Sequence, residues 1–521
     1  MPVSSDPVTS EPASQSHWHA ETLAQSVVIL LAMTAIQRVV GFGRGILFCR
    51  WMSAEQLGEW DVAFGFLMLA APLAVLGLPG SFGRYCEYYR QRGQLRVFLR
   101  RTTLLSAVMA LLAMAVVFVG REQFSVLIFG QRDHASVVGW LAITLGVVIL
   151  HNFLVSLFIA VRMYRVVTAL QFWQTIGFAV ISLALLKRWD DSSTSVVIAF
   201  ALATFTAAVV SVSWLRQVWN AAHDHAGATV AQSAFWAKLI PFALWIWLTN
   251  LLSNLFEVID RYMIVHHSGL EPLEALGQVG NYHSSRIIPL LFVSVTLLLG
   301  LLITPHLSFD WEAGRRKAVA DRLNLVLKAI AIALFVISIS VLFAAPWLFN
   351  GPFKGKFEGG LAVLPLTLAY CSWFGLSAVA QNYLWCAERA GLSGLALLAG
   401  LLLNIVLNLV LLPRYGLEGA VWATAVANLV AIALIYYFNV LAGMHVQRGT
   451  WICTFAPAVL WFGPLASLGV LMVLGLLAVS TDWILTADDK HQFAAAARTL
   501  IERLRPARLA SGAAGADAPL S

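Results

Sequence analysis

The sequence predicts an all-α polytopic membrane protein, with about fourteen transmembrane helices in two six-helix lobes and a C-terminal helical hairpin. Two observations lead to this fold class. Of the 521 residues, 60% are apolar and 12% are charged, which is about half the charged share of a soluble domain. Twelve apolar runs are each long enough to cross a bilayer, which takes about 20 residues. This composition excludes a water-soluble enzyme and an intrinsically disordered chain.

The apolar runs follow one another along the chain with short connections. A final stretch, 451–482, is long for one helix and short for two, and Gly463-Pro464 near its middle would break a helix. We interpret it as a hairpin, which brings the total to fourteen helices, and thirteen stays open. The preceding twelve runs are 25–50, 59–82, 101–119, 137–160, 167–186, 194–215, 239–265, 280–304, 324–347, 361–385, 393–412 and 417–442.

Charge asymmetry orients the chain, because lysine and arginine concentrate in cytoplasmic loops. With the N-terminus inside, the inner loops carry 16 lysines and arginines and the outer loops carry 7. Both termini are therefore predicted to be cytoplasmic. The predicted units are a disordered cytoplasmic tail (1–24), an N-lobe (25–216), a cytoplasmic linker (217–238), a C-lobe (239–442), the terminal hairpin (451–482) and a cytoplasmic tail (487–521) that contains an amphipathic interfacial helix at 489–505.

Several kinds of chemistry find no support in the sequence. The motifs G-x-x-x-x-G-K-[ST], G-x-S-x-G and H-E-x-x-H do not occur, so we expect a transporter rather than an ATP-driven pump or a hydrolase. The absence of a large external loop argues against a membrane glycan ligase or polymerase. The five cysteines have no C-x-x-C spacing, so we expect no disulfide, metal site or cofactor. The net charge of +7 fits cytoplasmic loops rather than a nucleic-acid-binding surface.

A weak internal repeat links the two lobes. The segment QLGEW at 56–60 opens the second predicted helix, and QVGNY at 278–282 opens the eighth. The offset of 222 residues corresponds to six helices. Transporters are often built from such repeats, with the substrate site between the two halves.

Ionisable residues inside apolar spans are costly and are therefore candidate functional groups. Counted at about 1.5 Å per residue, the arginine at position 38 lies roughly 20 Å from the inner face. The charged residues of the seventh and eighth helices and the second arginine of the first share the outer half of the bilayer. The full set is Arg38 and Arg44 in the first helix, His151 in the fourth, Glu257, Asp260 and Arg261 in the seventh, and Arg286 in the eighth.

The outer charges allow a structural and a gating interpretation. Glu257 and Arg261 are four residues apart on one helix and can pair with each other. Asp260 needs a partner on another helix, and Arg44 or Arg286 would serve. The set is then either a static ion-pair group or a gate that forms and breaks during transport, with Glu257 and Asp260 as gate or ion-coupling residues.

The remaining polar residues allow two roles each. Arg38 has no carboxylate at its depth, so it suits an anionic head group, with snorkelling or an unseen partner as the alternative. Asn250 and Asn254 are expected to line a cavity, and interhelical hydrogen bonding is the alternative. His151 is interpreted either as a cavity-lining proton relay or as a packing residue.

Four stretches, in this order and spacing, resemble a known family. Helix number and spacing agree over about residues 20–485, and the family is that of the polysaccharide transporters within the multidrug/oligosaccharidyl-lipid/polysaccharide flippase superfamily. The stretches are 43–51 followed by 56–60, then 260–262 followed by 279–282, then 387–391, and finally 404–413 followed by 416–420.

This resemblance implies two lobes around a central cavity that opens alternately to each side. It implies a polyprenyl-diphosphate-linked oligosaccharide as substrate, moved from the inner to the outer leaflet of a bacterial inner membrane for export of exopolysaccharide, O-antigen or capsule. Similar proteins are driven by proton or sodium gradients or by the membrane potential. Cavity arginines of such flippases meet the diphosphate, and the matching positions here are Arg38, Arg44, Arg261 and Arg286.

The resemblance also implies partners and leaves alternatives. The partners are the lipid-linked oligosaccharide, membrane lipids, and the polymerase and glycosyltransferases of the same pathway. The alternatives are a cation-coupled multidrug exporter of the same fold and a lipid II flippase. The excess of arginine argues against the exporter, which would need unmatched acidic residues for cationic drugs.

Overall fold

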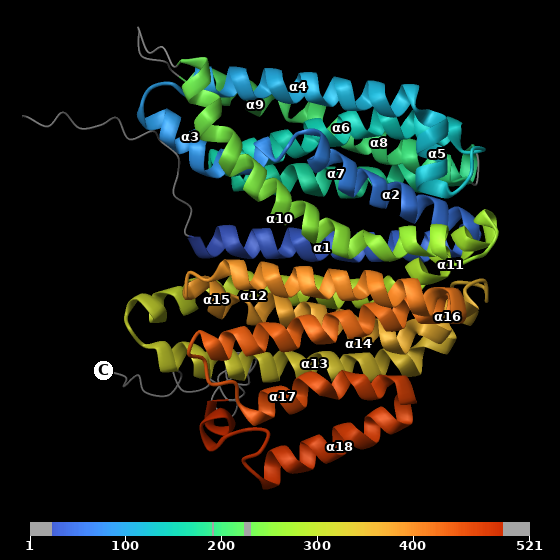
Figure 1. The fold of residues 1–521 in the computed structure, drawn as a ribbon, viewed down its shortest axis with the longest axis vertical. Coiled ribbons are helices and arrows are strands. Elements are labelled where there is room, and N and C mark those ends of the chain that lie inside the picture. The colour runs from blue at the N-terminus through green and yellow to red at the C-terminus, as the bar shows by residue number, and fades with distance from the viewer. Residues whose placement is uncertain (1–22, 190–191, 223–230, 493–521) are drawn as a thin grey trace, which may run out of the picture.

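The computed structural model describes residues 23–189, 192–222 and 231–492, and within these ranges the chain is helical and contains no strand (Figure 1). Ten of the described helices are long and apolar enough to cross a membrane. The predicted all-α, multi-pass membrane fold is thus confirmed, and the count of fourteen spans stays a prediction. The predicted N-terminal tail and most of the predicted amphipathic helix at 489–505 lie outside the described residues.

The first half of the chain forms the N-lobe. Its second helix begins with a capping box, in which Ser53 accepts from the backbone of Gln56 and the Gln56 side chain accepts from the backbone of Ser53. The elements are α1 Leu23–Trp51, α2 Ala54–Ala74, the 3₁₀ helix η1 Leu78–Ser81, α3 Phe82–Gln91, α4 Leu95–Val119, α5 Arg121–Phe129, α6 Ala135–Ala160, α7 Tyr164–Arg188, α8 Ser193–Val210 and α9 Val212–Ala221.

The second half forms the C-lobe, drawn from green to orange in Figure 1, and a terminal hairpin, drawn in orange-red. The C-lobe comprises α10 Gln232–His267, α11 Pro272–Arg286, α12 Pro289–Glu312, α13 Arg316–Asn350, α14 Glu358–Ala380, α15 Asn382–Cys386 and α16 Ala390–Leu441. The hairpin comprises α17 Arg448–Phe455, the 3₁₀ helix η2 Ala456–Phe462 and α18 Pro464–Ser480.

Three boundaries refine or correct the sequence-based elements. The eighth predicted helix is two, α11 and α12, because Pro289 occupies the first turn of a new helix. The eleventh and twelfth are joined without a loop as α16, with a kink at Gly416, whose φ of +56° favours glycine. The described parts of the predicted linker 217–238 are mostly helical, since α9 extends to Ala221 and α10 begins at Gln232.

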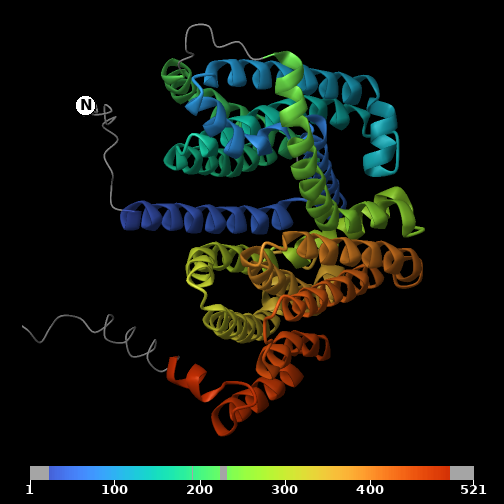
Figure 2. The same cartoon turned by 60° about the vertical axis from the view of Figure 1, so that its left-hand side comes forward.

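The terminal hairpin has the predicted break. Gly463 has a φ of +92° between η2 and α18, and Pro464 opens α18. Asn324 of α13 fastens the hairpin to the C-lobe, since its side chain accepts from the backbone of Gln447 at 3.1 Å and from the Thr450 hydroxyl at 2.7 Å. Figure 2 shows the hairpin below the C-lobe, on the side away from the N-lobe.

The helices run between two ends of the molecule, which we call the α3 end and the α11 end. The α3 end carries α3, α9 and the start of α10, and the α11 end carries α5, α11 and the kink of α16 (Figure 1). Helix α10 connects the lobes, because its first half packs on η1 and its second half on α16. Helix α1 lies between the lobes in both views and packs on α7 of the N-lobe (Figures 1 and 2).

Candidate functional site

The two copies of the sequence repeat pack against each other at the α11 end. A Cβ atom on Gly58 of α2 would lie 1.8 Å from the carbonyl oxygen of Leu276 of α11, and one on Gly280 would lie 1.9 Å from that of Ala54. Gly58 and Gly280 are 222 residues apart, and so are Ala54 and Leu276. The two contacts are therefore equivalent, as across a twofold axis. The close approach of α2 and α11, which we call the interlobe seam, explains why both copies keep glycine.

A buried ion-pair group lies next to the seam. Asp61 of α2 contacts Arg261 of α10, Oδ2 to Nε at 2.8 Å, and His283 of α11, Oδ1 to Nδ1 at 2.8 Å. Asp61 and Arg261 are 2% and 4% exposed. Asp61 and His283 are again 222 residues apart, so equivalent positions of the repeat pair with each other. This group joins the lobes because Asp61 belongs to one and its two partners to the other.

Sequence reasoning missed Asp61, although it directly follows the motif QLGEW. Extending both copies of the repeat by one residue would have aligned Asp61 with His283. The expected pair of Glu257 with Arg261 does not form: Arg261 binds Asp61, and Glu257 is exposed and makes no ion pair with any described residue. The physical reason is that Arg261 extends toward α2, whereas Glu257 lies on an open face of α10.

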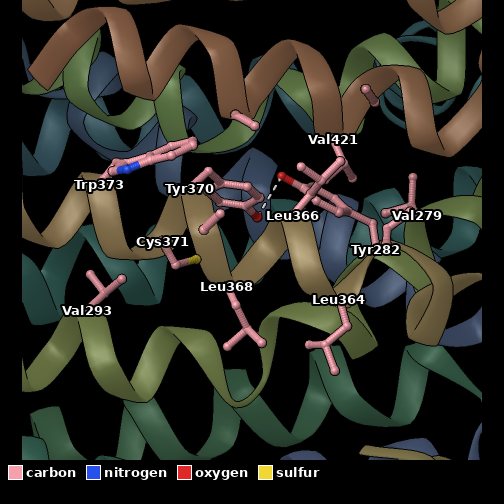
Figure 3. Close-up of a cluster of buried hydrophobic side chains, with 14 of the residues drawn as sticks. Val279, Tyr282, Val293, Leu364, Leu366, Leu368, Tyr370, Cys371, Trp373 and Val421 are labelled. Atoms are coloured by element: carbon pink, nitrogen blue, oxygen red, sulfur yellow. Dashed lines mark hydrogen bonds between the residues drawn. The ribbon is translucent and has the colours of Figure 1, made fainter. Parts of the chain in front are cut away.

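Asp260 also has different partners from those expected. Instead of Arg44 or Arg286, its carboxylate accepts only from neutral side chains of the C-lobe, and it is 2% exposed. The donors are the amides of Asn404 and Asn408, both at 3.0 Å, the Thr424 hydroxyl at 2.7 Å and the Tyr282 hydroxyl at 3.1 Å. Tyr370 donates in turn to Tyr282 at 3.0 Å, the bond dashed in Figure 3. Asp260 thus ties α10 to α11 and to both halves of α16.

Three of the predicted substrate-binding arginines make no ion pair with any described residue. Arg286 is 6% exposed, its Nε has no hydrogen-bond partner, and its guanidinium lies 5.1 Å from the centre of the Tyr282 ring. Arg44 is half-buried and lies 4.1 Å over the ring of Phe178. Arg38 is exposed on α1. The fourth, Arg261, is held by Asp61.

The predicted cavity-lining residues divide into three cases. Asn250 is exposed on α10. Asn254 donates to the backbone oxygen of Met68 at 3.2 Å, which makes it a contact between the lobes. His151 is 5% exposed, and its Nδ1 has no hydrogen-bond partner. It therefore lies in the packed interior of the N-lobe rather than on an open surface.

No group of three or more His, Cys, Asp or Glu residues is placed to hold a metal ion in the described parts of the chain. The five cysteines are free thiols, four of them buried. Within the described residues, the ion-pair group that joins the two lobes consists of Asp61, Arg261 and His283.

Solved structures with a similar fold include a lipid II flippase and multidrug resistance MATE family transporters of the MOP superfamily. The lipid II flippase MurJ in an inward closed conformation superposes with a TM-score of 0.66 at 13% identity, over 86% of this chain and 98% of that one. An inward-facing multidrug resistance MATE family transporter gives 0.62 at 12% identity, over 80% and 97%. An outward-facing MATE structure gives 0.53 at 13% identity, over 79% and 94%. The protein therefore has the fold shared by these membrane transporters.

The sequence itself identifies the family. The model of the polysaccharide biosynthesis protein family matches residues 23–294, more than half of the chain. The chain belongs to this family. A search of curated protein sequences gives no match.

Proposed function

We propose that this protein moves a polyprenyl-diphosphate-linked oligosaccharide from the inner to the outer leaflet of a bacterial inner membrane, for polysaccharide export. The observation that carries the proposal is the set of three arginines, Arg38, Arg44 and Arg286, that make no ion pair with a described carboxylate. Unpaired cations within a membrane-spanning chain are costly and point to an anionic ligand. Membership of the polysaccharide biosynthesis family supports a glycan as the cargo.

The chemistry of the substrate suits these side chains. A diphosphate cannot enter hydrocarbon without compensation of its charge. Arginine offers bidentate, charge-assisted hydrogen bonds that match phosphate oxygens. Arg44 and Arg286 stand on aromatic rings, which hold the guanidinium in place without neutralising it. The prenyl chain can remain in the lipid while the head group moves between the lobes.

Alternating access supplies the movement in this proposal. The interlobe seam closes the α11 end, which we assign to the outer side because the loops of the α3 end carry the excess of lysine and arginine. Opening to the outside then requires α2 and α11 to separate and the Asp61–Arg261 ion pair to break. Both termini lie on the cytoplasmic side in this orientation. The polymerase and glycosyltransferases of the same pathway are the expected partners.

Asp260 is the residue that we assign to ion coupling. Its carboxylate, the Thr424 hydroxyl and the Asn404 side chain are clustered, and the side-chain oxygen of Asn408 is buried without a hydrogen-bond partner. Oxygen ligands of this kind suit a hard cation such as sodium, and the carboxylate alone suits a proton. Because the cluster joins both halves of α16, a bound cation would change the packing of α10 against α16.

A lipid II flippase is the second candidate, favoured by the superposition on MurJ. Both substrates carry a prenyl diphosphate, so the same arginines serve either, and only the glycan differs. A multidrug exporter is less well supported. An exporter of cations would need acidic residues without partners, whereas Asp61 and Asp260 already accept from side chains of the protein. Of the three described acidic residues Asp61, Glu257 and Asp260, Glu257 is the one that is exposed and makes no ion pair.

The test is a transport assay with purified protein in liposomes. A labelled polyprenyl-diphosphate oligosaccharide and labelled lipid II are followed separately as they become accessible to a membrane-impermeant reagent. Removal of a charge-assisted hydrogen bond costs about 1.5–3 kcal/mol, so Arg286→Gln and Arg38→Ala should each slow movement roughly 10- to 150-fold. The control is Arg121→Ala, which removes an exposed arginine on α5.

Retained movement in both arginine variants, at normal protein level, would refute the assignment of the site. Movement of lipid II alone would replace the substrate by the second candidate. Accumulation of a cationic drug without movement of either lipid would overturn the substrate class and leave the fold intact.

A further inference from the structure

The two lobes differ in charge at the α3 end. In the N-lobe, α3, the start of α4, the turn 161–165, α9 and the start of α10 carry ten basic residues and one acidic residue, Glu87, and the connection 222–231 adds a second acidic residue, Asp224. The C-lobe segments at the same end, 306–323, 386–391 and 442–448, carry six lysines and arginines and four acidic residues. We call the N-lobe set the basic platform. It consists of Arg84, Arg90, Arg92, Arg96, Arg100, Arg101, Arg162, Arg165, Arg216 and Lys238.

Several residues of the basic platform make cation–π contacts with aromatic rings of α3 and α10. The Arg92 guanidinium lies 3.6 Å from the centre of the Tyr88 ring, and the Lys238 ammonium lies 3.5 Å from the same centre. The Arg84 guanidinium lies 5.0 Å from the ring of Phe242. These contacts bring α3 and α10 together, and the Tyr85 hydroxyl reinforces the junction by donating to the backbone oxygen of Lys238 at 3.0 Å.

The cations at this junction are not neutralised by the described protein. Arg84, Arg92 and Lys238 make no ion pair with any residue that the structure describes, and Glu87 is already bound to Arg90 at 2.8 Å. The charges of Arg92 and Lys238 share one ring and lie within about 7 Å of each other. Their mutual repulsion is unfavourable, and a bound anion would relieve it. In the C-lobe, by contrast, Asp310 binds both Arg315 and Arg322.

The position of the basic platform identifies the kind of anion. Directly after Arg100 and Arg101, α4 presents an exposed apolar stripe, formed by Leu104, Val108, Leu111 and Leu112. Trp219 on α9 and Tyr164 at the start of α7 are also exposed. Basic and aromatic side chains at the edge of an apolar stripe are typical of the level of lipid head groups. Helices α4 and α9 lie on the side of the N-lobe away from the C-lobe (Figure 2).

We propose that the basic platform binds the phosphate head group of an anionic membrane phospholipid, with Arg92 and Lys238 as its central contacts. The position beside α4 and α9, on the outward side of the N-lobe (Figure 2), favours a resident membrane lipid over a transported one, which would have to lie between the lobes. Such a lipid would hold α3 and the start of α10 together. Since α10 also packs on α16, the bound lipid would stabilise the position of the helix that joins the lobes.

The experiment is a lipid titration of the purified full-length protein in detergent, with bound lipids counted by native mass spectrometry. Dioleoyl phosphatidylglycerol and dioleoyl phosphatidylcholine share their chains and differ in charge. A basic residue near a lipid surface contributes about fivefold in affinity, so the double variant R92Q/K238Q should bind phosphatidylglycerol roughly 30-fold more weakly. The wild type should prefer phosphatidylglycerol, and added salt should weaken this preference.

Two further variants control for charge and folding. R316Q/K317Q removes two exposed cations from the C-lobe at the same end and should bind like the wild type. R92K/K238R keeps both charges and should retain binding, which separates loss of the site from loss of the fold.

Three results would overturn the proposal. The first is equal binding of the two phospholipids by the wild type. The second is an equal loss of binding in R92Q/K238Q and R316Q/K317Q. The third comes from a separate titration with a polyprenyl diphosphate. If this lipid binds in a manner that depends on Arg92 and Lys238 while phosphatidylglycerol does not bind, the surface is an entry point for substrate.

Discussion

The backbone contact between α2 and α11 leads to a specific prediction for Gly58→Ala. The new Cβ would lie 1.8 Å from the carbonyl oxygen of Leu276, and separations under 3.0 Å essentially do not occur. Because the obstacle is backbone, no change of rotamer can relieve the contact. Helices α2 and α11 must move apart, so the substitution selectively destabilises the arrangement in which the α11 end is closed.

The magnitude follows from the overlap. The Cβ and the oxygen must separate from 1.8 Å to at least 3.0 Å, which disturbs the whole interlobe seam. Overpacking typically costs about 1–3 kcal/mol, so the closed population should fall roughly 5- to 150-fold relative to the open one. The repeat makes the same prediction for Gly280→Ala, whose Cβ would meet the carbonyl oxygen of Ala54 at 1.9 Å. Once either substitution has opened the seam, the second should add little.

The assay measures the distance between the lobes at the α11 end. Spin labels on Glu122→Cys of α5 and Leu273→Cys of α11 report it, since both side chains are exposed. Both glycine variants should shift the distance distribution to longer values. Gly43→Ala is the matched control, because its Cβ meets no atom within 4 Å. An unchanged distribution in Gly58→Ala, with normal folding, would refute the reasoning that the seam is held by backbone contact.

Three other variants test the buried charges. Asp61→Asn leaves Arg261 buried without its counter-charge and should destabilise the protein by about 3–5 kcal/mol, whereas Asp61→Asn with Arg261→Gln should recover part of the loss in thermal unfolding; additive losses would contradict direct pairing. Asp260→Asn should make liposome transport insensitive to sodium and proton gradients while the spin-label distance stays unchanged, and a retained gradient dependence would exclude Asp260 as the coupling residue. Burial raises the pKa of Asp489, but hydrogen bonds from Lys328 and Thr486 outweigh burial and hold the pKa of that carboxyl below its ordinary value. The stability from this pair is therefore full above the ordinary carboxyl pKa of about 4 and is lost as the pH falls through the lowered value. In Asp489→Asn the melting temperature should therefore depend less on pH below about pH 4 than in the wild type; an unchanged dependence on pH would contradict the pairing.

Local sequence composition accounts for most of the architecture. An apolar run long enough to cross a bilayer must form a helix there, because lipid cannot satisfy backbone groups. The break at Gly463-Pro464 and the kink at Gly416 also follow from local chemistry, since glycine readily adopts the positive φ found at both positions. These features need no knowledge of what each helix packs against.

The partners of the intramembrane charges could not be derived in this way. Counting residues along a helix gives the depth of Asp260 or Arg261 but not the direction in which each side chain points. The structure turns Arg261 toward Asp61 and surrounds Asp260 with neutral donors, so both expected pairings were wrong. Asp61 itself was overlooked, although it directly follows the first copy of the repeat.

The sequence by itself thus determined the class of fold, the number of repeats and which residue types enter the membrane, because each depends on short stretches of chain and on solvation by lipid. Only the tertiary structure decided that the two copies of the repeat face each other, with Gly58 against Leu276 and Asp61 against His283. The physical reason is that rotation about helix axes and the choice of neighbour are set by packing between segments more than 200 residues apart.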